Sequence, residues 1–258
     1  MNSRSIRASC TTGRRPLAHG TTSELTPPVI VLGMHRSGTS LVTGRLEAAG
    51  VYLGQVNTAA GNNAKGNREN EALRQVHDAM ITDRGFDWKT PPDGPIAWTE
   101  SETTAILEQL APYAGKPIWG FKDPRSLWLL DGYLDLFPDA RLIAPVRHPA
   151  SVAKSLNARP KSLSLSLDEG RRLWRVTNEA LLRVRDSHPL TLLRFSDLGV
   201  EDPLFSGPFD AFLHSHGLTI DAPEFYDRDL VHQTDLALDL DREDLDLWQR
   251  LLEAVQAQ

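Results

Sequence analysis

The sequence predicts an α/β protein built on a parallel sheet that lies between two layers of helices. Short apolar runs alternate with stretches of helical periodicity, and such runs are typical of strands buried on both faces. This alternation, with a glycine turn after the first strand, favours a three-layer sheet. Strands are predicted at residues 29–33, 117–122, 141–147 and 190–195, and helices near 39–49, 68–81, 102–113, 149–157, 167–186 and 242–257, with one more beginning near Pro208.

The composition is that of an ordinary globular domain. The chain has 258 residues, of which 40% are hydrophobic and 24% are charged. This length suits one domain with a well-filled core. The net charge of −6 gives no reason to expect a nucleic-acid partner. Because Cys10 is the only cysteine, no internal disulfide is expected, and a reducing, cytoplasmic setting fits best.

The first 27 residues differ from the rest of the chain. They are rich in Ser, Thr, Gly and Pro, carry arginines, and lack the apolar stretch of a secretory signal. This composition predicts a disordered basic leader over residues 1–27 and a single domain over residues 28–258. No apolar run in the sequence approaches the roughly 18 residues needed to cross a bilayer, so no transmembrane segment is expected.

The first strand runs into the segment GMHRSGTS, residues 33–40, and then into a helix. This segment matches the phosphate-loop pattern G-x-x-x-x-G-x-[ST], but Thr39 stands where nucleoside triphosphatases have lysine. Its glycines let backbone N–H groups converge on an anion, and the following helix adds the positive end of its dipole. The cation of the loop is Arg36, a bidentate donor. A Gly/Ser turn without a ligand is the alternative, but the position directly after an apolar strand favours a phosphate site.

The residues HRSGTSL within this loop resemble the 5′-phosphosulfate loop of sulfotransferases that use 3′-phosphoadenylyl sulfate (PAPS), in particular the bacterial type. The family has a parallel three-layer sheet related to P-loop nucleoside triphosphate hydrolases. The resemblance implies that the 5′ end of PAPS is bound by Arg36, Ser37, Gly38, Thr39 and Ser40.

A second stretch, RLIAPVRHPASVAKSL, resembles the 3′-phosphate site of the same family. In that site an arginine ends a strand, and a serine follows eight residues later on a helix, as Arg147 and Ser155 do here. A strand-end guanidinium and a hydroxyl two helical turns further on can hold one phosphate from two sides. A surface arginine and an unrelated helix serine are the alternative.

A third stretch, WGFKDPRSLWLL, places Lys122 and Asp123 at the end of a strand. Lys122 matches a lysine that contacts the transferred sulfuryl group in some family members. Those members carry their catalytic histidine two residues later, where this chain has Pro124. The histidine mechanism therefore does not carry over, and the base must lie elsewhere.

Three residues are candidates for the general base. The segment GNNAKGNRENEALRQVHDAM is similar to an Asn-x-x-Gly-x-x-Glu pattern of bacterial sulfotransferases, here Asn63, Gly66 and Glu69. On the predicted helix Glu69 lies on the apolar face and points inward, which suits a general base. Its alternative role is to complement the helix dipole. His77 and Asp123 are the other candidates, although a structural histidine and an ion-paired aspartate are their more ordinary roles.

The resemblance is diffuse further along the chain. The family motif G-x-x-G-x-x-K, which closes over the 3′ phosphate in many animal members, is absent, and Ser196 replaces an acidic residue before Asp197. The segment DRDLVHQ, with Arg228 and His232, is a candidate for covering that phosphate instead. Two further segments, FDWKTPPDGPIAW with its two tryptophans and RPKSLSLSLDEG, are candidates for the walls of an acceptor site.

These motifs together predict a PAPS-dependent sulfotransferase that acts on a hydroxyl of a carbohydrate, glycolipid or secondary metabolite. Arg36, Lys122 and Glu69 are the expected catalytic residues, and no metal is expected. A metal-dependent P-loop kinase, with Ser40 and Asp123 holding Mg²⁺, is one alternative. A non-catalytic nucleotide-binding module is the other. The sequence identifies neither the acceptor nor the oligomeric state.

Overall fold

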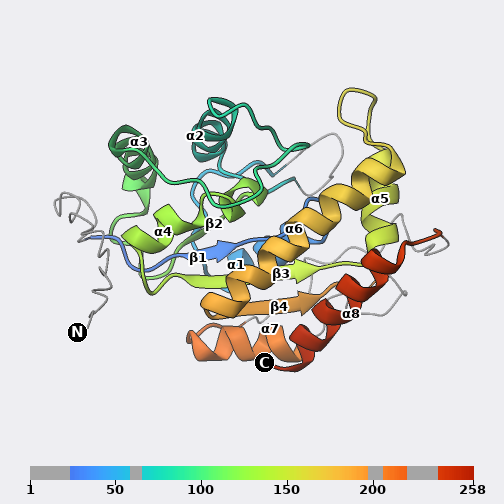
Figure 1. Cartoon of the computed structure of the whole chain (residues 1–258). Coiled ribbons are helices and arrows are strands. Elements are labelled where there is room, and N and C mark those ends of the chain that lie inside the picture. The colour runs from blue at the N-terminus through green and yellow to red at the C-terminus, as the bar shows by residue number, and fades with distance from the viewer. Residues whose placement is uncertain (1–23, 59–65, 197–205, 220–237) are drawn as a thin grey trace, which may run out of the picture.

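The centre of the protein is a parallel sheet of four strands in the order β2-β1-β3-β4 (Figure 1). The structure is a computed structural model that describes residues 24–58, 66–196, 206–219 and 238–258. All four predicted strands are present, which confirms the expected parallel α/β class. The strands are β1 (Val29–Val31), β2 (Gly120–Lys122), β3 (Arg141–Val146) and β4 (Leu190–Arg194).

Helices flank this sheet on both faces (Figure 1). The seven predicted helices correspond to α1, α2, α3, α5, α6, α7 and α8, and α4 is additional. Within the described part of the chain, every helix is too short or too polar to span a bilayer. The helices are α1 (Thr39–Ala48), α2 (Glu71–Thr82), α3 (Glu100–Leu110), α4 (Leu130–Leu136), α5 (Pro149–Asn157), α6 (Leu167–Ser187), α7 (Ser206–Ser215) and α8 (Arg242–Gln256), with 3₁₀ turns at Ala111–Tyr113 and Pro124–Leu127.

The strands bury both faces because successive side chains enter two different apolar clusters. Val29 and Val31 pack with residues of α1 and α7, whereas Ile30 and Leu32 pack with residues of α2 to α6 and α8. Each of these four side chains is at most 1% exposed. Two buried faces explain why the strands read as continuous apolar runs, and they establish the three-layer arrangement.

The strand order reverses at β1, and this reversal locates the ligand crevice. Ile30 of β1 pairs with Phe121 of β2 on one side and with Leu142 of β3 on the other. In open parallel sheets, ligands bind beyond the carboxyl ends of the strands at such a switch point. The crevice is therefore bordered by the glycine loop after β1, by the end of β2 and by Arg147 after β3.

Helix α4, which the sequence analysis did not predict, has a glycine as its third residue. A Cβ atom on Gly132 would come within 2.1 Å of the Trp98 indole, so the glycine is what allows this ring to lie against the helix. Trp98 also packs edge-on against Tyr133, with the ring centroids 4.8 Å apart. Trp98 was a candidate acceptor wall in the sequence, and the structure instead places it in packing contact with α4.

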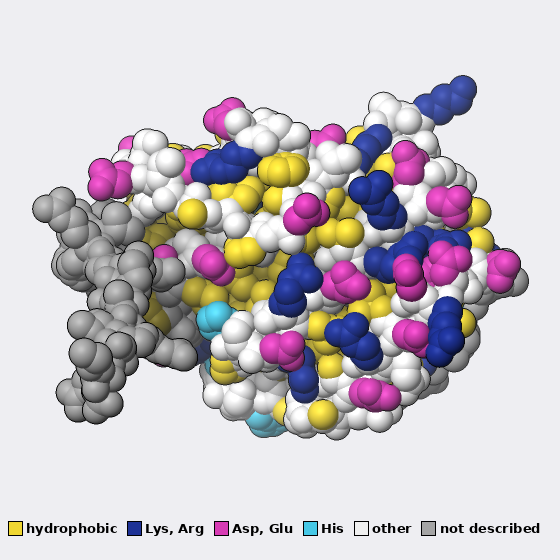
Figure 2. All heavy atoms as spheres, viewed as in Figure 1, with side chains coloured by type: hydrophobic (Ala, Val, Ile, Leu, Met, Phe, Trp, Pro, Cys, Tyr) yellow, Lys and Arg dark blue, Asp and Glu magenta, His cyan; other side chains and the backbone are white. Residues whose placement is uncertain are grey.

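Helix α8 is held against α6 by ion pairs. The Nε atom of Arg171 donates to Asp244 at 2.7 Å, and Arg175 contacts the same carboxylate at 3.2 Å. Asp244 is fully buried. Basic and acidic side chains are interspersed on the molecular face that carries these two helices (Figure 2). The contact matters for the crevice because α6 carries Trp174, whose indole donates to the carbonyl of Arg147 at 2.9 Å.

Candidate active site

The loop between β1 and α1 turns tightly, with three residues in the left-handed region of backbone conformation. Gly33 and Gly38 have φ values of 123° and 97°, and Arg36 has a φ of 69°. A non-glycine residue in this region costs roughly 1–2 kcal/mol. The conformation is held from outside the loop, because the Nη1 atom of Arg147 donates to the Arg36 carbonyl at 2.9 Å.

The loop presents hydrogen-bond donors suited to an anion. Helix α1 begins after Gly38 without a side-chain cap, so the amides of its first turn face the loop as a positive dipole end. The hydroxyl of Ser37 is fully buried and has no hydrogen-bond partner within the described residues. A buried hydroxyl left unpaired costs about 1–3 kcal/mol, so a ligand oxygen at this point is favourable. These features fit a bound phosphate or sulfate group.

The structure brings together residues of the two predicted phosphate sites. Arg36 Nε donates to the Ser155 hydroxyl at 2.7 Å, although the sequence assigned Arg36 to the 5′ end and Ser155 to the 3′ end of the donor. Burial, together with the positive charges of Arg159 and Arg147, lowers the pKa of Arg36 to about 10. Arg36 thus stays charged at neutral pH while it lies among other cations, and an anion bound there relieves their repulsion.

Phe195, directly after β4, links the glycine loop to Arg147. The Arg147 guanidinium carbon lies 4.7 Å from the centre of the Phe195 ring, within the range of a cation–π contact. The same ring packs against Gly38, where an added Cβ atom would come within 2.4 Å of it. The sequence analysis did not identify Phe195. Its position after the last strand of the sheet was the available signal.

Glu69 lies before α2 and not within it, which corrects the predicted helix boundary. The helix begins at Glu71 because the Asn70 side chain accepts hydrogen bonds from the first-turn amides of Ala72 and Leu73. Glu69 itself is held in a short pairing in which its carbonyl accepts from the amide of Asn57 at 3.1 Å. Glu69 is therefore not a first-turn residue, and both the helical-wheel argument and the alternative role at the helix dipole are wrong, although its side chain is buried as expected.

Glu69 forms a buried ion pair with Lys122. Lys122 Nζ donates to Glu69 Oε1 at 2.6 Å, and the two residues are 4% and 9% exposed. The pair connects the end of β2 to the segment before α2. In this segment Gly66 has a φ of 74°, and a Cβ atom on it would come within 2.2 Å of the Asn57 carbonyl. The structure therefore places a carboxylate and an ammonium side by side at the carboxyl edge of the sheet.

His77 and Asp123, the other two candidate bases, are engaged in a buried network. Tyr133 donates its hydroxyl to His77 Nε2 at 2.6 Å, and His77 Nδ1 donates to Asp123 at 2.8 Å. Arg125 Nη1 also donates to Asp123, at 2.9 Å. Burial alone would raise the pKa of Asp123, but the hydrogen bond from His77 and the charge of Arg125 hold it well below its usual range. These contacts describe structural roles for both residues.

The network predicts a loss of stability when its histidine is removed. His77→Leu would leave one oxygen of the Asp123 carboxylate and the Tyr133 hydroxyl without a buried partner, while Arg125 still holds the other oxygen. We therefore expect the free energy of unfolding to fall by about 2–4 kcal/mol. Urea denaturation measures this loss. The exposed His214→Leu is the matched control, with a change within about 0.5 kcal/mol. An equally small change for His77→Leu would contradict the structural assignment.

His35, inside the glycine loop, is a site residue that the sequence analysis missed. Burial, with the positive charges of Arg125, Arg159 and Lys122, holds the pKa of His35 well below its usual range. The ring is therefore neutral at physiological pH. It packs edge-on against Trp88, with centroids 5.2 Å apart.

The two segments proposed as acceptor walls meet next to this histidine. The guanidinium of Arg159 lies 5.3 Å from the centre of the Trp88 ring. Lys89 Nζ donates to the carbonyl of Ser162 at 3.4 Å, so the loop after α2 and the loop after α5 are in contact. Trp88 and Arg159 thus belong to one wall beside the glycine loop.

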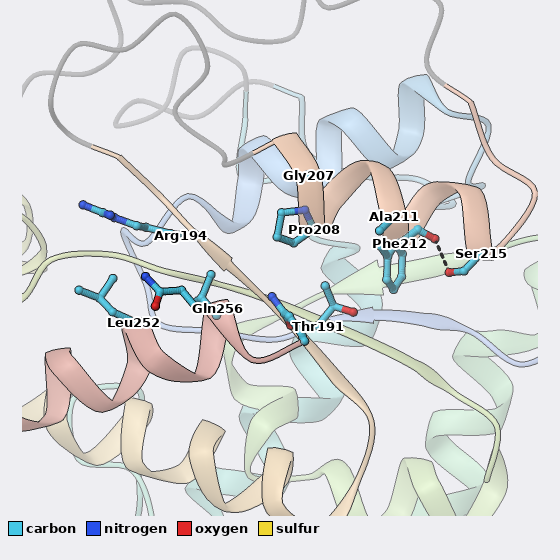
Figure 3. Close-up of a pocket in the computed structure, with 11 residues that line it drawn as sticks. Thr191, Arg194, Gly207, Pro208, Ala211, Phe212, Ser215, Leu252 and Gln256 are labelled. Atoms are coloured by element: carbon cyan, nitrogen blue, oxygen red, sulfur yellow. Dashed lines mark hydrogen bonds between the residues drawn. The ribbon is translucent and has the colours of Figure 1, made fainter.

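A cavity of about 630 Å³ lies elsewhere, at the β4 edge of the sheet between α7 and α8 (Figure 3). Thr191 and Arg194 of β4, Phe212 of α7 and residues of α8 line it, and none of the predicted site residues does. Next to it, the Gln258 side chain accepts a hydrogen bond from the Leu192 amide of β4 at 2.9 Å. The cavity is therefore separate from the crevice at the switch point.

Several sequence predictions fall outside the described residues. They concern most of the basic leader with Cys10, Asn63 of the Asn-x-x-Gly-x-x-Glu pattern, Asp197 after β4, and Arg228 and His232. The described site therefore consists of the glycine loop and the ends of β2, β3 and β4, with Glu69 and the wall formed by Trp88 and Arg159.

A parallel three-layer sheet with a glycine-rich anion loop after its first strand defines a protein of the P-loop-like α/β class. Within that class, the sequence model of the sulfotransferase family matches residues 27–202, more than half of the chain. The chain belongs to the sulfotransferase family.

One solved sulfotransferase domain shares this fold, and two further sulfotransferases are similar to the chain. The sulfotransferase domain from the curacin biosynthetic pathway matches with a TM-score of 0.51 and 14% identity, over 89% of this chain and 99% of that chain. The sulfotransferase domain of the Synechococcus PCC 7002 olefin synthase matches with a TM-score of 0.49 and 17% identity, over 90% and 98% of the two chains. Sulfotransferase STF1 from Mycobacterium tuberculosis H37Rv has a TM-score of 0.47 and 16% identity, over 91% and 77%. No curated protein matches the chain in sequence.

Proposed function

We propose that this sulfotransferase transfers the sulfuryl group of PAPS to the hydroxyl of an acceptor. The observation that supports the donor most directly is the joint placement of Arg36, Ser155 and Arg147 beside the amino end of α1. PAPS carries a phosphosulfate at its 5′ end and a phosphate at its 3′ position, and these residues offer charge-assisted donors for both.

The described residues fit the two ends of this donor. The 5′ phosphosulfate would take the first-turn amides of α1, the buried Ser37 hydroxyl and the Arg36 guanidinium. The 3′ phosphate would lie between Arg147 and Ser155. On binding, Arg36 would exchange its hydrogen bond to Ser155 for one to the donor.

The transfer itself is an in-line displacement at sulfur. The acceptor oxygen forms a bond to sulfur while the bond between sulfur and the bridging oxygen breaks. The acceptor proton moves to the Glu69 carboxylate, and the electron pair of the broken bond stays on the 5′ phosphate of the departing adenosine bisphosphate. Arg36 neutralises the charge that grows on this phosphate. Most of the rate gain would come from positioning and fixed charges.

The ion pair between Glu69 and Lys122 would link uptake of the acceptor proton by Glu69 to stabilisation of the sulfuryl group by Lys122. In the resting protein the ammonium is bound to the carboxylate at 2.6 Å. Once Glu69 has taken the acceptor proton, it no longer neutralises Lys122. The ammonium is then available to the oxygens of the transferring sulfuryl group. One buried pair would thereby serve as base and as electrostatic stabiliser in sequence.

The contacts of Ser40 and Asp123 disfavour the kinase alternative. That function needs both residues as ligands of Mg²⁺. In the structure the Ser40 hydroxyl donates to the Asn67 carbonyl at 3.2 Å, and Asp123 is bound to His77 and Arg125. Both side chains would have to leave these partners before they could bind a metal ion.

Incubation of the protein with ³⁵S-labelled PAPS and a panel of sugars, glycolipids, phenols and alcohols tests the proposal. We expect labelled product and adenosine 3′,5′-bisphosphate (PAP) in equal amounts. Turnover of ATP that requires Mg²⁺, without binding of PAP, would establish the kinase instead. Tight PAP binding with no transfer across the panel would establish a binding module.

Arg147→Ala is expected to weaken PAP binding by about 10- to 100-fold, the loss of one or two charge-assisted hydrogen bonds. Calorimetric titration should show a clearly smaller loss for 5′-AMP, which lacks the 3′ phosphate and would feel only the loss of the hydrogen bond from Arg147 to the Arg36 carbonyl. The exposed Arg183→Ala is the matched control. A parallel loss for PAP and 5′-AMP would mean that Arg147 does not read the 3′ phosphate.

A further inference from the structure

Arg159 differs from the other cations around the glycine loop. Lys122, Arg125 and Arg159 all act on the charge state of His35. The first two are bound to acidic side chains. Within the described residues Arg159 makes no ion pair, and its Nε atom is buried without a hydrogen-bond partner. A buried guanidinium nitrogen without a partner is unfavourable unless a ligand supplies the acceptor.

The guanidinium is also held in a defined place. It lies over the Trp88 ring at 5.3 Å, and His35 approaches the same ring at 5.2 Å. The contact between Lys89 and Ser162 fixes the two loops that carry Trp88 and Arg159 against each other. An arginine stacked in this way keeps its planar set of N–H donors oriented, and this set matches the two oxygens of a carboxylate or phosphate.

Arg159 interacts electrostatically with Arg36 of the glycine loop and with Glu69, the proposed base. Burial lowers the pKa of Arg159, and the Glu69 carboxylate opposes this shift. Its positive charge is in turn a cause of the lowered pKa of Arg36. Arg159 therefore lies within electrostatic reach of the cation that serves the donor and of the carboxylate that serves the acceptor.

We infer that Arg159, stacked on Trp88, binds a carboxylate or phosphate group of the acceptor, which makes the acceptor an acidic hydroxy compound. This inference rests on the proposed function and names the class of its acceptor. The donor anions have their own partners in the amino end of α1, Arg36 and Arg147. Arg159 instead belongs to a wall with an indole and a neutral imidazole, which suits the body of an organic acceptor with an acidic end.

Calorimetry on the PAP-loaded protein tests the anion site without any transfer step. The probes are phenylacetate and phenyl phosphate, with phenylacetamide as the neutral match. The parent protein should bind at least one of the two acids roughly tenfold more tightly than the amide, as one charge-assisted pair predicts. Arg159→Gln should abolish this preference, Arg159→Lys should keep part of it, and Arg183→Gln, at an exposed arginine of α6, should leave it unchanged. Which acid is preferred distinguishes a carboxylate site from a phosphate site.

Two results would overturn the inference. One is equal affinity of the acids and the amide in the parent protein. The other is a preference that persists in Arg159→Gln, and a tenfold loss of PAP affinity in that variant would then show that Arg159 serves the donor. Failure of the proposed function is visible separately, as PAPS that is not consumed in the transfer assay while the probes still bind.

A kinetic arm connects the anion site to turnover. The kcat/KM for 4-hydroxyphenylacetate and for 4-hydroxyphenylacetamide is measured with PAPS in excess, and glucose 6-phosphate is compared with glucose in the same way. We expect Arg159→Gln to lower kcat/KM roughly tenfold for the preferred acidic acceptor and hardly at all for its neutral match. The KM for PAPS should stay within about twofold of the parent value. Equal losses for the acidic and neutral compounds would contradict a role in binding the acidic group.

Discussion

Arg36→Ala is expected to lower kcat by about 10²–10³-fold, because the main cation facing the leaving phosphate would be lost. In the structure this guanidinium reaches the Ser155 hydroxyl, so it already lies where the proposed donor sites adjoin. Charge on the bridging oxygen grows as the sulfuryl group departs. A fixed cation therefore stabilises the transition state more than the bound substrate, and the loss should appear in kcat more than in the KM for PAPS.

The backbone at Arg36 calls for matched variants in this experiment. The residue has a φ of 69°, which alanine adopts less readily than glycine. Arg36→Gly removes the side chain without this strain, and Arg36→Lys keeps a charge but loses the planar fork. Single-turnover transfer of ³⁵S-sulfate should show alanine and glycine equally impaired and lysine intermediate. Nearly normal turnover in Arg36→Gly would exclude Arg36 from the leaving-group role.

The four strands could be predicted from the sequence because each of them is marked by its own residues. Each strand is an apolar run flanked by polar turns, and both faces of β1 are buried in separate clusters. The glycine loop could also be predicted, since Gly33 and Gly38 mark the points where the backbone takes positive φ. A short continuous apolar run bounded by turn residues is typical of a strand that is buried on both faces.

Other features depended on contacts between distant residues, and these were missed. The start of α2 was placed too early because Asn70 caps the helix from a pairing with residues near Asn57, which no local pattern reveals. Helix α4 was overlooked, and it contains Gly132, a residue of low helix propensity whose role is to admit the Trp98 ring. Propensity is a weak prior that tertiary packing overrides.

Contacts between distant residues also explain which parts of the site could not be predicted from the sequence. Arg36, Lys122 and Arg147 belong to motifs, and their chain positions alone made them candidates. Phe195 was not identified, and Arg159 was included only as the first residue of the candidate wall segment RPKSLSLSLDEG. Their roles follow from what lies against them, the Gly38 backbone in one case and the Trp88 ring in the other. Side chains that act by filling a space between elements become visible only when the elements are placed.

Glu69→Gln is expected to lower kcat by about 10²–10⁴-fold, the usual contribution of a positioned general base. Glutamine is nearly isosteric, and its amide oxygen can still accept the hydrogen bond that Lys122 now donates at 2.6 Å. The variant therefore removes proton acceptance while it keeps much of the local geometry. The affinity for PAP, measured by calorimetry, should change little.

The acidity of the acceptor separates a base from a structural carboxylate. A hydroxyl that loses its proton easily needs less help from the enzyme, so the defect of Glu69→Gln should shrink from alkyl alcohols to phenol and further to 4-nitrophenol. Lys122→Met is the matched variant, because it breaks the same ion pair but leaves the carboxylate. Its defect should not follow acceptor acidity in this way. If Glu69→Gln slowed all three acceptors equally, Glu69 would be a partner of Lys122 only. The neutral His35 would then be the next residue to test as the base, since His77 and Asp123 are bound within their own network.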